Sequence, residues 1–262
     1  MADISIISLL LMLTLTVPIF IINRFLKLGI NRSLGISIIR MSLQLTFVGV
    51  YLQYIFLWNN PYINILYLLI MITIASSHSI SSSNLKLKKL FIPITLSIAI
   101  PQLTVLLIFN LLIAGKEYLF DAKFIIPIGG MLLGNCLNGN IIALNSFYTG
   151  IKDDEKRYNY SLTLGASHNQ AIIPYMRKSM TLAIKPNIAS MATMGLVAIP
   201  GMMTGQILAG ALPLTAIKYQ GAIIIAILTA KYFSILLSIL LSKGAAFNRY
   251  KTLNIDIFRK SY

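Results

Sequence analysis

Acidic residues and cysteines are scarce in this sequence. The chain has seven Asp and Glu against 22 Lys and Arg, and its single cysteine is Cys136. One cysteine excludes an internal disulfide and a zinc cluster. All seven carboxylates fall outside the long apolar runs, and neither histidine lies in the middle of one. The sequence therefore disfavours a proton-driven carrier, because such carriers commonly use chains of Asp, Glu or His inside the membrane.

Charged residues of either sign are also rare. They make up 11% of the chain, whereas a soluble domain has about 25%. Hydrophobic residues make up 57%, mean hydropathy is +0.80, and several apolar runs reach the roughly 18 residues that cross a bilayer. These features predict an all-α, polytopic membrane helix bundle. The net charge of +15 is spread through the loops, so we expect no nucleic-acid partner.

We expect seven membrane spans in a single domain covering residues 1–262. Their approximate ranges are 4–22, 34–57, 63–80, 90–114, 124–148, 187–212 and 220–242. The first run has no basic segment before it and is too long for the core of a signal peptide, so we interpret it as a retained span. Of the 22 basic residues, 18 fall in one set of loops and the carboxyl-terminal tail. The positive-inside rule then places the amino terminus outside and the carboxyl terminus in the cytoplasm.

The stretch from Gly195 to Gln206 interrupts an otherwise apolar segment. Pro200 removes a backbone donor and clashes with the preceding turn, so a helix here is expected to kink or break. Broken helices inside membranes commonly line a transport path. Close helix packing is an equal alternative, because Gly201 and Gly205 form a GxxxG pair. The path candidates in this stretch are Pro200, Gly201, Met202, Met203, Thr204, Gly205 and Gln206.

Polar residues in two other spans are further path candidates. Arg40 and Gln44 lie four residues apart and so share one face of the second span. Arg40 serves there either as an interface anchor or, less favoured, as a ligand. In the fifth span, Asn135 needs a hydrogen-bond partner at membrane depth. It follows a second GxxxG pair, Gly130 and Gly134, which predicts another close-packing face.

Lys231, His78 and a group of methionines complete the unusual residues. Lys231 lies deep in the last span, where it should face the bundle or snorkel, and the sequence identifies no carboxylate partner for it. A single histidine such as His78 is a poor metal site without neighbouring ligands. Thioethers suit soft metals but more often fill a core; the methionines in question are Met131, Met191, Met194, Met202 and Met203.

Residues 149–186 are expected to form the only sizeable soluble segment, a cytoplasmic loop. Within it, Leu164, Gly165, Ala166 and Ser167, followed by Pro174, predict two short helices joined at a glycine turn. A short helix with one apolar face suits a groove in a partner protein. The alternative is a helix that lies on the bilayer surface.

This segment resembles the cytoplasmic coupling loop of ABC-transporter permeases. The Glu-Ala-Ala start that is usual in those permeases falls here on Asn159, Tyr160 and Ser161. Residues 125–243 resemble FetB-type permeases more closely, and the face of Arg40 and Gln44 fits the same family loosely. The matching motifs are Gly134-Asn135, Leu164-Gly165-Ala166, Arg177, Pro186, Ser190-Met191, Gly195-Leu196-Val197, residues 200–208, Gly210, Pro213, Ala216 and Tyr219-Gln220.

The resemblance implies a permease subunit that exports iron or another metal. A separate ATP-binding cassette subunit would hold the ATP and Mg²⁺ and would dock on Leu164, Gly165, Ala166, Ser167 and Pro174. No Gly-x-x-x-x-Gly-Lys-Ser/Thr loop occurs in the chain, so we expect no cofactor and no enzyme activity of its own. By family analogy the permease is a homodimer in the bacterial inner membrane.

Three alternatives to metal export remain open. The first is an ABC exporter of an organic solute such as a nucleotide sugar. The second is an ATP-independent channel, which would also use a broken helix but would not need a coupling loop. The third is a membrane scaffold, which would show neither flux nor stimulation of an ATPase.

Overall fold

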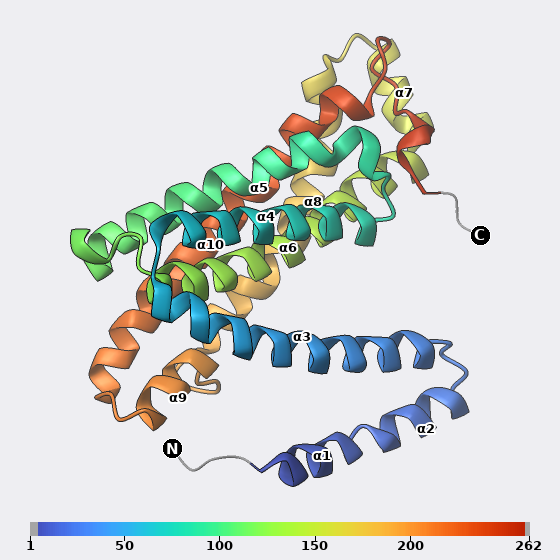
Figure 1. Cartoon of the computed structure of the whole chain (residues 1–262). Coiled ribbons are helices and arrows are strands. Elements are labelled where there is room, and N and C mark those ends of the chain that lie inside the picture. Colours follow the sequence, from blue (N-terminus) through green and yellow to red (C-terminus); the bar gives the residue numbers. More distant parts are fainter. Residues whose placement is uncertain (1–4, 260–262) are drawn as a thin grey trace. The chain divides into compact units, whose positions relative to one another are not determined.

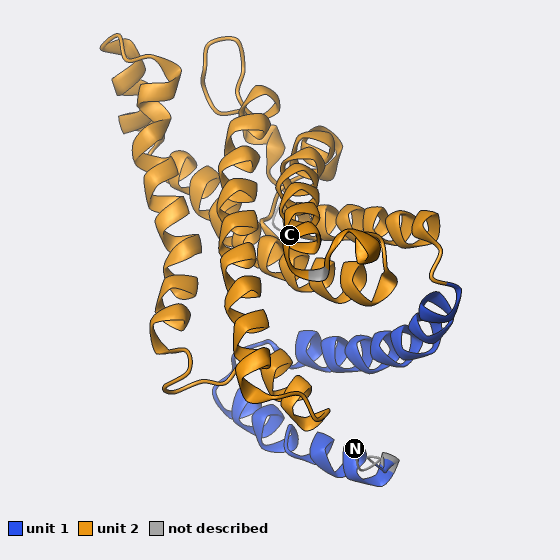
Figure 2. Ribbon diagram, turned by 90° about the vertical axis from the view of Figure 1, so that its left-hand side faces the viewer, with its two compact units in different colours: residues 1–58 blue, residues 59–262 orange. Residues whose placement is uncertain are grey.

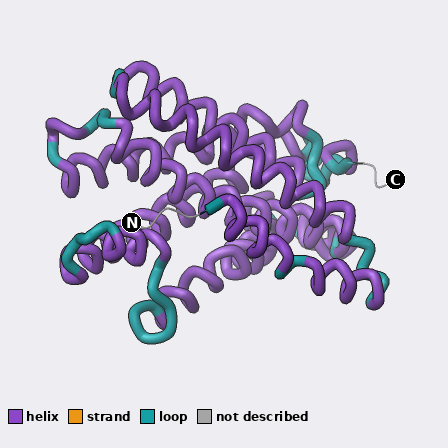
Figure 3. Tube along the Cα trace, turned by 60° about the horizontal axis from the view of Figure 1, so that its bottom comes forward, coloured by secondary structure: helices purple, strands orange, loops and turns teal. Residues whose placement is uncertain are grey.

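The computed structural model describes residues 5–259, which fold mostly into helices joined by short connections (Figures 1 and 3). Within those residues no extended strand forms, and only three isolated bridges link backbone segments. The prediction of an all-α chain is therefore confirmed. The chain divides into two compact units, the first ending at Trp58 and the second starting at Asn59 (Figure 2).

The first unit consists of α1 (Ile6–Thr14), α2 (Val17–Phe25) and α3 (Asn31–Trp58). The first two helices belong to one apolar segment, Ile7–Phe25, with a turn at residues 15–16. Pro18 lies in the first turn of α2, where the missing N–H removes no helical hydrogen bond. The Asn31 side chain donates a hydrogen bond of 3.1 Å to the carbonyl of Phe20, which ties the start of α3 to α2.

The second unit is a helix bundle organised around α10 (Pro213–Ala246). This helix packs against α5 (Leu87–Phe109), α6 (Ala122–Asp153), α8 (His168–Thr193) and α9 (Gly201–Leu208). A further helix, α4 (Pro61–Ser82), packs on α5 and α6. The smaller elements are the π-helical turn η1 (Asn110–Ala114), the 3-10 turns η2 (Lys116–Tyr118) and η3 (Ile255–Ile257), and the short helix α7 (Glu155–Thr163).

Short polar side chains define where two of the long helices begin. The Asn60 side-chain oxygen Oδ1 accepts the Tyr62 backbone N–H at 2.9 Å at the start of α4. Asp121 accepts the Lys123 N–H at 2.8 Å at the start of α6. Each cap satisfies a backbone donor that has no partner inside its helix. The core of the unit then forms where buried aliphatic side chains of α5, α6 and α10 meet.

Six segments of the described residues are long and apolar enough to cross a membrane. They correspond to the predicted spans 4–22 (α1 and α2), 34–57 (α3), 63–80 (α4), 90–114 (α5 and η1), 124–148 (α6) and 220–242 (α10). Ile4, the predicted start of the first span, lies outside the described residues. The predicted count of seven is not confirmed, because residues 187–212 are not one helix: they include the end of α8, a loop, and α9.

Residues 149–186, expected as a loop, are mostly helical. They contain the end of α6, all of α7 and most of α8. The predicted glycine turn is confirmed, because Gly165 has φ +91° and lies between α7 and α8. The second helix is not short, however: α8 has 26 residues, and both Pro174 and Pro186 lie inside it. Proline weakens a helix by removing one donor, and here it does not end the helix.

A tail clasp, residues 247–259, folds back over the bundle after α10. The Lys86 N–H donates to the Ile257 carbonyl at 2.7 Å, and the Arg259 N–H donates to the Asn84 carbonyl at 2.8 Å. Ile257 and Leu85 are fully buried beneath these bonds. The clasp therefore fixes the connection between α4 and α5 to the carboxyl-terminal part of the chain.

Neither predicted GxxxG pair provides a close-packing face among the described residues of the second unit. Among the described residues, no atom would lie within 4 Å of a Cβ built on Gly134, Gly201 or Gly205. A Cβ on Gly130 would meet only the end of the Met71 side chain, at 3.4 Å. Packing of Gly201 and Gly205 against another helix is therefore not seen within the second unit.

Two other glycines of α6 do allow close contacts. A Cβ on Gly129 would lie 2.9 Å from Leu68 Cδ1, and a Cβ on Gly139 would lie 2.5 Å from Lys231 Cε and 3.0 Å from Ile235 Cδ1. Gly139 is therefore the position that leaves room for the Lys231 side chain between α6 and α10.

We expect Gly139→Ala to destabilise the protein by about 1–3 kcal/mol, because the added methyl displaces the Lys231 stem from a packed site. Gly134→Ala is the matched control on the same helix. It meets open space and should be neutral or stabilising by up to about 1 kcal/mol, because alanine is the better helix former. Chemical unfolding of the detergent-solubilised protein measures both. Equal stability of the two variants would contradict the assignment of Gly139.

Candidate functional site

A helical elbow lies at one end of α8, and we define it as α7, the turn 164–167 and the first two turns of α8, residues 168–175. Gly165 supplies the left-handed backbone conformation of the turn, with φ +91°. Ser167 and Gln170 form a capping box: the Ser167 hydroxyl accepts the Gln170 N–H at 3.3 Å, and the Gln170 side chain accepts the Ser167 N–H at 2.8 Å. The elbow consequently has a fixed shape.

The outer surface of the elbow carries a small apolar face among charged and polar side chains. Tyr160 and Leu164 are 64% and 70% exposed, and their spacing of four residues places them on one face. The predicted coupling residues all fall in this elbow: Leu164, Gly165, Ser167 and Pro174 are exposed, and Ala166 is half-buried. A small apolar projection of fixed shape can insert into a groove of a partner protein.

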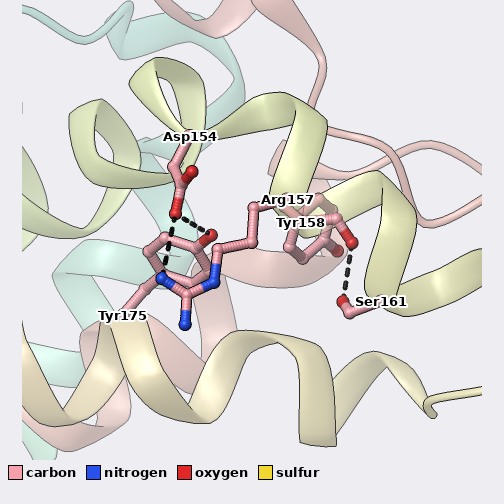
Figure 4. A network of polar contacts seen from close by, with 5 residues as sticks. All are labelled: Asp154, Arg157, Tyr158, Ser161 and Tyr175. Carbon is pink, nitrogen blue, oxygen red and sulfur yellow. Dashed lines mark hydrogen bonds and ion pairs between the residues drawn. The ribbon is translucent and has the colours of Figure 1, made fainter.

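A cavity of about 570 Å³ lies behind the elbow, lined by the ends of α6, α7 and α8. The Tyr175 hydroxyl donates to the Asp154 carboxylate at 3.0 Å, and the Arg157 guanidinium lies 3.9 Å from the same carboxylate (Figure 4). Burial, and then Asp154, raise the pKa of Tyr175 to about 12. Tyr175 therefore remains a protonated donor at neutral pH. Ala166 and Pro174 line this cavity as well.

Tyr158 connects the elbow to the tail clasp. Its hydroxyl donates to the Lys251 carbonyl at 2.7 Å and lies 3.1 Å from His168 Nδ1. Because the single hydroxyl proton is used on the carbonyl, the imidazole donates from Nδ1 to the tyrosine oxygen. The Phe247 ring packs edge-on against His168 at 4.6 Å between ring centroids, and Ser161 Oγ donates to the Tyr158 carbonyl at 2.7 Å (Figure 4). The clasp thus holds the elbow on two sides.

Protonation of His168 is expected to loosen this junction. Burial lowers the pKa of His168 below 6.5, and Lys243 and Lys251 lower it further. The unfolded state then binds the proton more readily than the folded state, so stability is highest above the unfolded pKa and falls as pH drops through 6.5. We expect a lower Tm at a pH of about 5.5 than at about 7.5, and a smaller difference in His168→Gln. His78→Gln, which changes the other histidine, should keep the wild-type difference in Tm between the two pH values. If both variants reduced that difference equally, the pH dependence could not be assigned to His168.

The predicted break near Pro200 is confirmed. After α8 the chain turns at Gly195, which has φ +83° and whose N–H donates to the Ala198 carbonyl at 3.0 Å. Pro200 then precedes α9 as its cap residue, and its carbonyl accepts the Thr204 N–H at 3.0 Å. Gly195 therefore reverses the chain direction, and Pro200 starts a new helix. Both effects depend only on residues close in the sequence.

A cavity of about 380 Å³ lies between this broken segment and α10. Pro200 and Met203 line it, together with Met194 and Gln220. Gln220 is 9% exposed, and its Oε1 accepts no hydrogen bond from the described residues. The remaining path candidates of this segment do not line the cavity; Gly201 and Thr204 are exposed, whereas Met202, Gly205 and Gln206 are half-buried.

The other path candidates lie elsewhere. Asn135 is half-buried on α6, and its amide donates back to the Met131 carbonyl of the same helix at 2.9 Å. Arg40 and Gln44 are exposed on α3, in the first unit. Of the path candidates, the structure thus brings only Pro200 and Met203 to this cavity and does not add Asn135 to it. Within residues 5–259, no group of three His, Cys, Asp or Glu is placed to hold a metal ion.

Lys231 has a partner that sequence reasoning did not find. Its ammonium donates to Asn187 Oδ1 of α8 at 2.5 Å. The side chain is 4% exposed, and Gly139 of α6 leaves room for it. Lys231 therefore lies where α6, α8 and α10 meet.

A polar seam continues from Lys231 along α10, and we define it as Ser97, Asn140, Tyr148, Ser234, Ser238 and Ser242. The Asn140 amide donates to Ser234 Oγ at 2.7 Å and its oxygen accepts from Ser238 Oγ at 2.5 Å. Ser238 also contacts Ser97 Oγ at 2.6 Å. The sequence carried a signal for the seam, because residues 231, 234, 238 and 242 recur with the period of one helix face.

Six helical segments of membrane length among residues 5–259, with buried polar contacts such as those of Asn140 between them, define a helical integral membrane protein. The family model described as "Uncharacterised protein family (UPF0014)" matches residues 6–247. The chain belongs to this family, and the predicted resemblance to FetB-type permeases is confirmed by its relatives.

The relatives come from bacteria and plants. The chain is 34% identical to "UPF0014 membrane protein slr1647" of Synechocystis over 74% of this chain and 75% of the relative. It is 29% identical to "Probable iron export permease protein FetB" of Escherichia coli over 97% of this chain and 96% of that protein. It is also 29% identical to "Protein ALUMINUM SENSITIVE 3" of Arabidopsis thaliana, over 74% and 70%. No solved structure matches the chain.

Proposed function

We propose that this chain is the permease subunit of an ABC transporter that exports iron or another metal with ATP hydrolysed by a separate subunit. The observation that carries the proposal is the similarity to a probable iron export permease along 97% of the chain. The exposed elbow adds support, because Tyr160 and Leu164 offer the kind of projection that a partner groove accepts. By the positive-inside rule the elbow lies in the cytoplasm, and by family analogy the membrane is the bacterial inner membrane.

In this proposal α8 is the mechanical link. Its 26 residues span about 39 Å as a helix, with the elbow at one end and the broken segment at the other (Figure 1). Closure of two ATP-binding subunits on a permease homodimer pushes the elbow. The displacement is carried along α8 to residues 194–200, where the non-helical backbone can change conformation and open the cavity beside Met203 and Gln220.

The test is ATP-driven uptake of iron into inverted membrane vesicles that contain this chain and its candidate ATPase. Inverted vesicles turn export into uptake. We expect uptake that is lost without ATP and without the partner subunit. Uptake that continues without ATP would establish the ATP-independent channel instead. ATPase stimulation without iron uptake would indicate an organic solute as the cargo. Absence of both ATPase stimulation and iron uptake would contradict the proposed function.

A further inference from the structure

We infer that Lys231 binds an oxyanion group of the cargo, so that the transported species carries a carboxylate or phosphate and is not a bare metal cation. The inference deepens the proposed transport function and rests on it for the word cargo. It starts from the ammonium at the junction of α6, α8 and α10, which is 4% exposed and donates to Asn187 Oδ1 at 2.5 Å.

The hydrogen-bonding capacity of Lys231 is incompletely used. A lysine ammonium has three donors, and among the described residues the hydrogen bond to Asn187 uses one of them. An amide oxygen is also neutral, so it solvates the ammonium without balancing its charge. A buried charge without a counter-ion is costly. A carboxylate or phosphate at this position would supply both the missing acceptors and the missing charge.

The charged residues of α8 and α10, the helices that meet at Lys231, favour binding of an anion over binding of a cation. Residues 168–246 contain six Lys and Arg and no Asp or Glu. Lys178 and Lys185 lie seven residues apart on one face of α8, and both are exposed. Lys178 also lines the cavity behind the elbow, and Lys185 lies two residues before Asn187. Lys178 and Lys185 give this face of α8 a positive potential that concentrates anions and repels a free dication.

A purely structural role for Lys231 would tie α8 to α10. Asn187→Asp separates the two roles, because it converts the hydrogen bond into an ion pair at the same place. If Lys231 is only a tie, the ion pair preserves it and transport continues. If Lys231 binds cargo, the new carboxylate occupies the ammonium permanently. We then expect ATP-driven uptake of the anionic probe to fall about tenfold or more, with an unchanged or higher Tm.

Two substitutions of Lys231 and one of an exposed lysine on α10 complete the set of test variants. Lys231→Gln keeps a donor for Asn187 but removes the charge, and should raise the KM for the anionic probe about tenfold. Lys231→Arg keeps the charge and should retain part of the uptake. Lys218→Gln removes an exposed lysine of the same helix and is the matched control, with wild-type uptake expected.

The binding test needs no partner subunit. The purified full chain in detergent is titrated with citrate and, separately, with pyrophosphate, and Tm is followed. We expect at least one anion to raise Tm in the wild type, and neither to do so in Lys231→Gln or Asn187→Asp. Citrate alone identifies a carboxylate cargo, such as a metal chelate, and pyrophosphate alone identifies a phosphate-bearing solute. No shift in the wild type, or the same shift in Lys231→Gln, overturns the inference even if iron uptake is ATP-driven.

The transport test uses vesicles with the partner subunit and compares free ferrous ion, ferric citrate and a nucleoside diphosphate sugar. Uptake of an anionic probe that Asn187→Asp abolishes agrees with the inference. Uptake of free ferrous ion that is unchanged in both Asn187→Asp and Lys231→Gln overturns it while leaving the proposed export function in place. Failure of that function is distinct, because it removes dependence on ATP and on the partner whatever the anion titration shows.

Discussion

Replacing Gly165 with valine is expected to abolish stimulation of the partner ATPase and ATP-driven uptake while the bundle stays folded. Gly165 has φ +91°, a conformation that a β-branched residue does not adopt without strain of about 1–2 kcal/mol. That cost is small beside a typical folding free energy of roughly 5–15 kcal/mol. The turn relieves the strain by changing shape, and the apolar face of Tyr160 and Leu164 then no longer fits its groove.

Gly115→Val is the matched control for this experiment. Gly115 also has φ +91°, and a Cβ at either glycine meets open space. Its ψ of 163° lies in a region that essentially only glycine adopts, so valine there carries at least as much backbone strain as at Gly165. Gly115 lies between η1 and η2, at the far end of α5 from the tail clasp. We expect it to lower Tm at least as much as Gly165→Val does but to leave ATPase stimulation intact. Equal stimulation in both variants would remove the elbow from the coupling mechanism.

The membrane spans were largely predictable because the signal for them is local. An apolar run long enough to cross a bilayer has few alternatives, and six of the predicted spans correspond to helices. The predicted span 187–212 is not one helix, because Gly195 turns the chain after α8 and Pro200 begins α9. Conversely, residues 168–186 were expected as a short helix within a cytoplasmic loop, because Arg177, Lys178 and two prolines interrupt the apolar pattern, whereas they belong to the 26-residue α8. Those charged side chains lie on its exposed face, where they do not oppose the helix.

In the candidate site, too, features set by neighbouring residues were predictable, and contacts between distant residues were not. Gly165 and Pro200 act within a few residues of themselves, and both the turn and the break were predictable from the sequence. The contact between Lys231 and Asn187 joins residues 44 apart, and nothing in either segment names the other. Sequence composition does not predict this contact, because the contact depends on how α8 packs on α10. The assignment of individual path and coupling residues therefore remains a prediction for the variants above.

Asn140→Leu is expected to destabilise the protein by roughly 2–3 kcal/mol, the combined effect of several hydrogen bonds lost between buried helices. Asn140 is fully buried; its amide donates to the Cys136 carbonyl and to Ser234 Oγ, and its oxygen accepts from Ser238 Oγ. Leucine has a similar volume, so a cavity is not the cause. The loss is limited because serine hydroxyls can turn to carbonyls of their own helix.

Asn138→Leu provides the comparison, because Asn138 is exposed on the same helix two residues away and its replacement should change stability by no more than about 0.5 kcal/mol. Chemical unfolding in detergent gives both values. A double-mutant cycle with Ser238→Ala then isolates the bond between the helices, and we expect a coupling of about 0.5–2 kcal/mol. Additive effects would mean that Asn140 and Ser238 act independently. The hydrogen bond between Asn140 and Ser238 would then not stabilise the packing of α10 on α6.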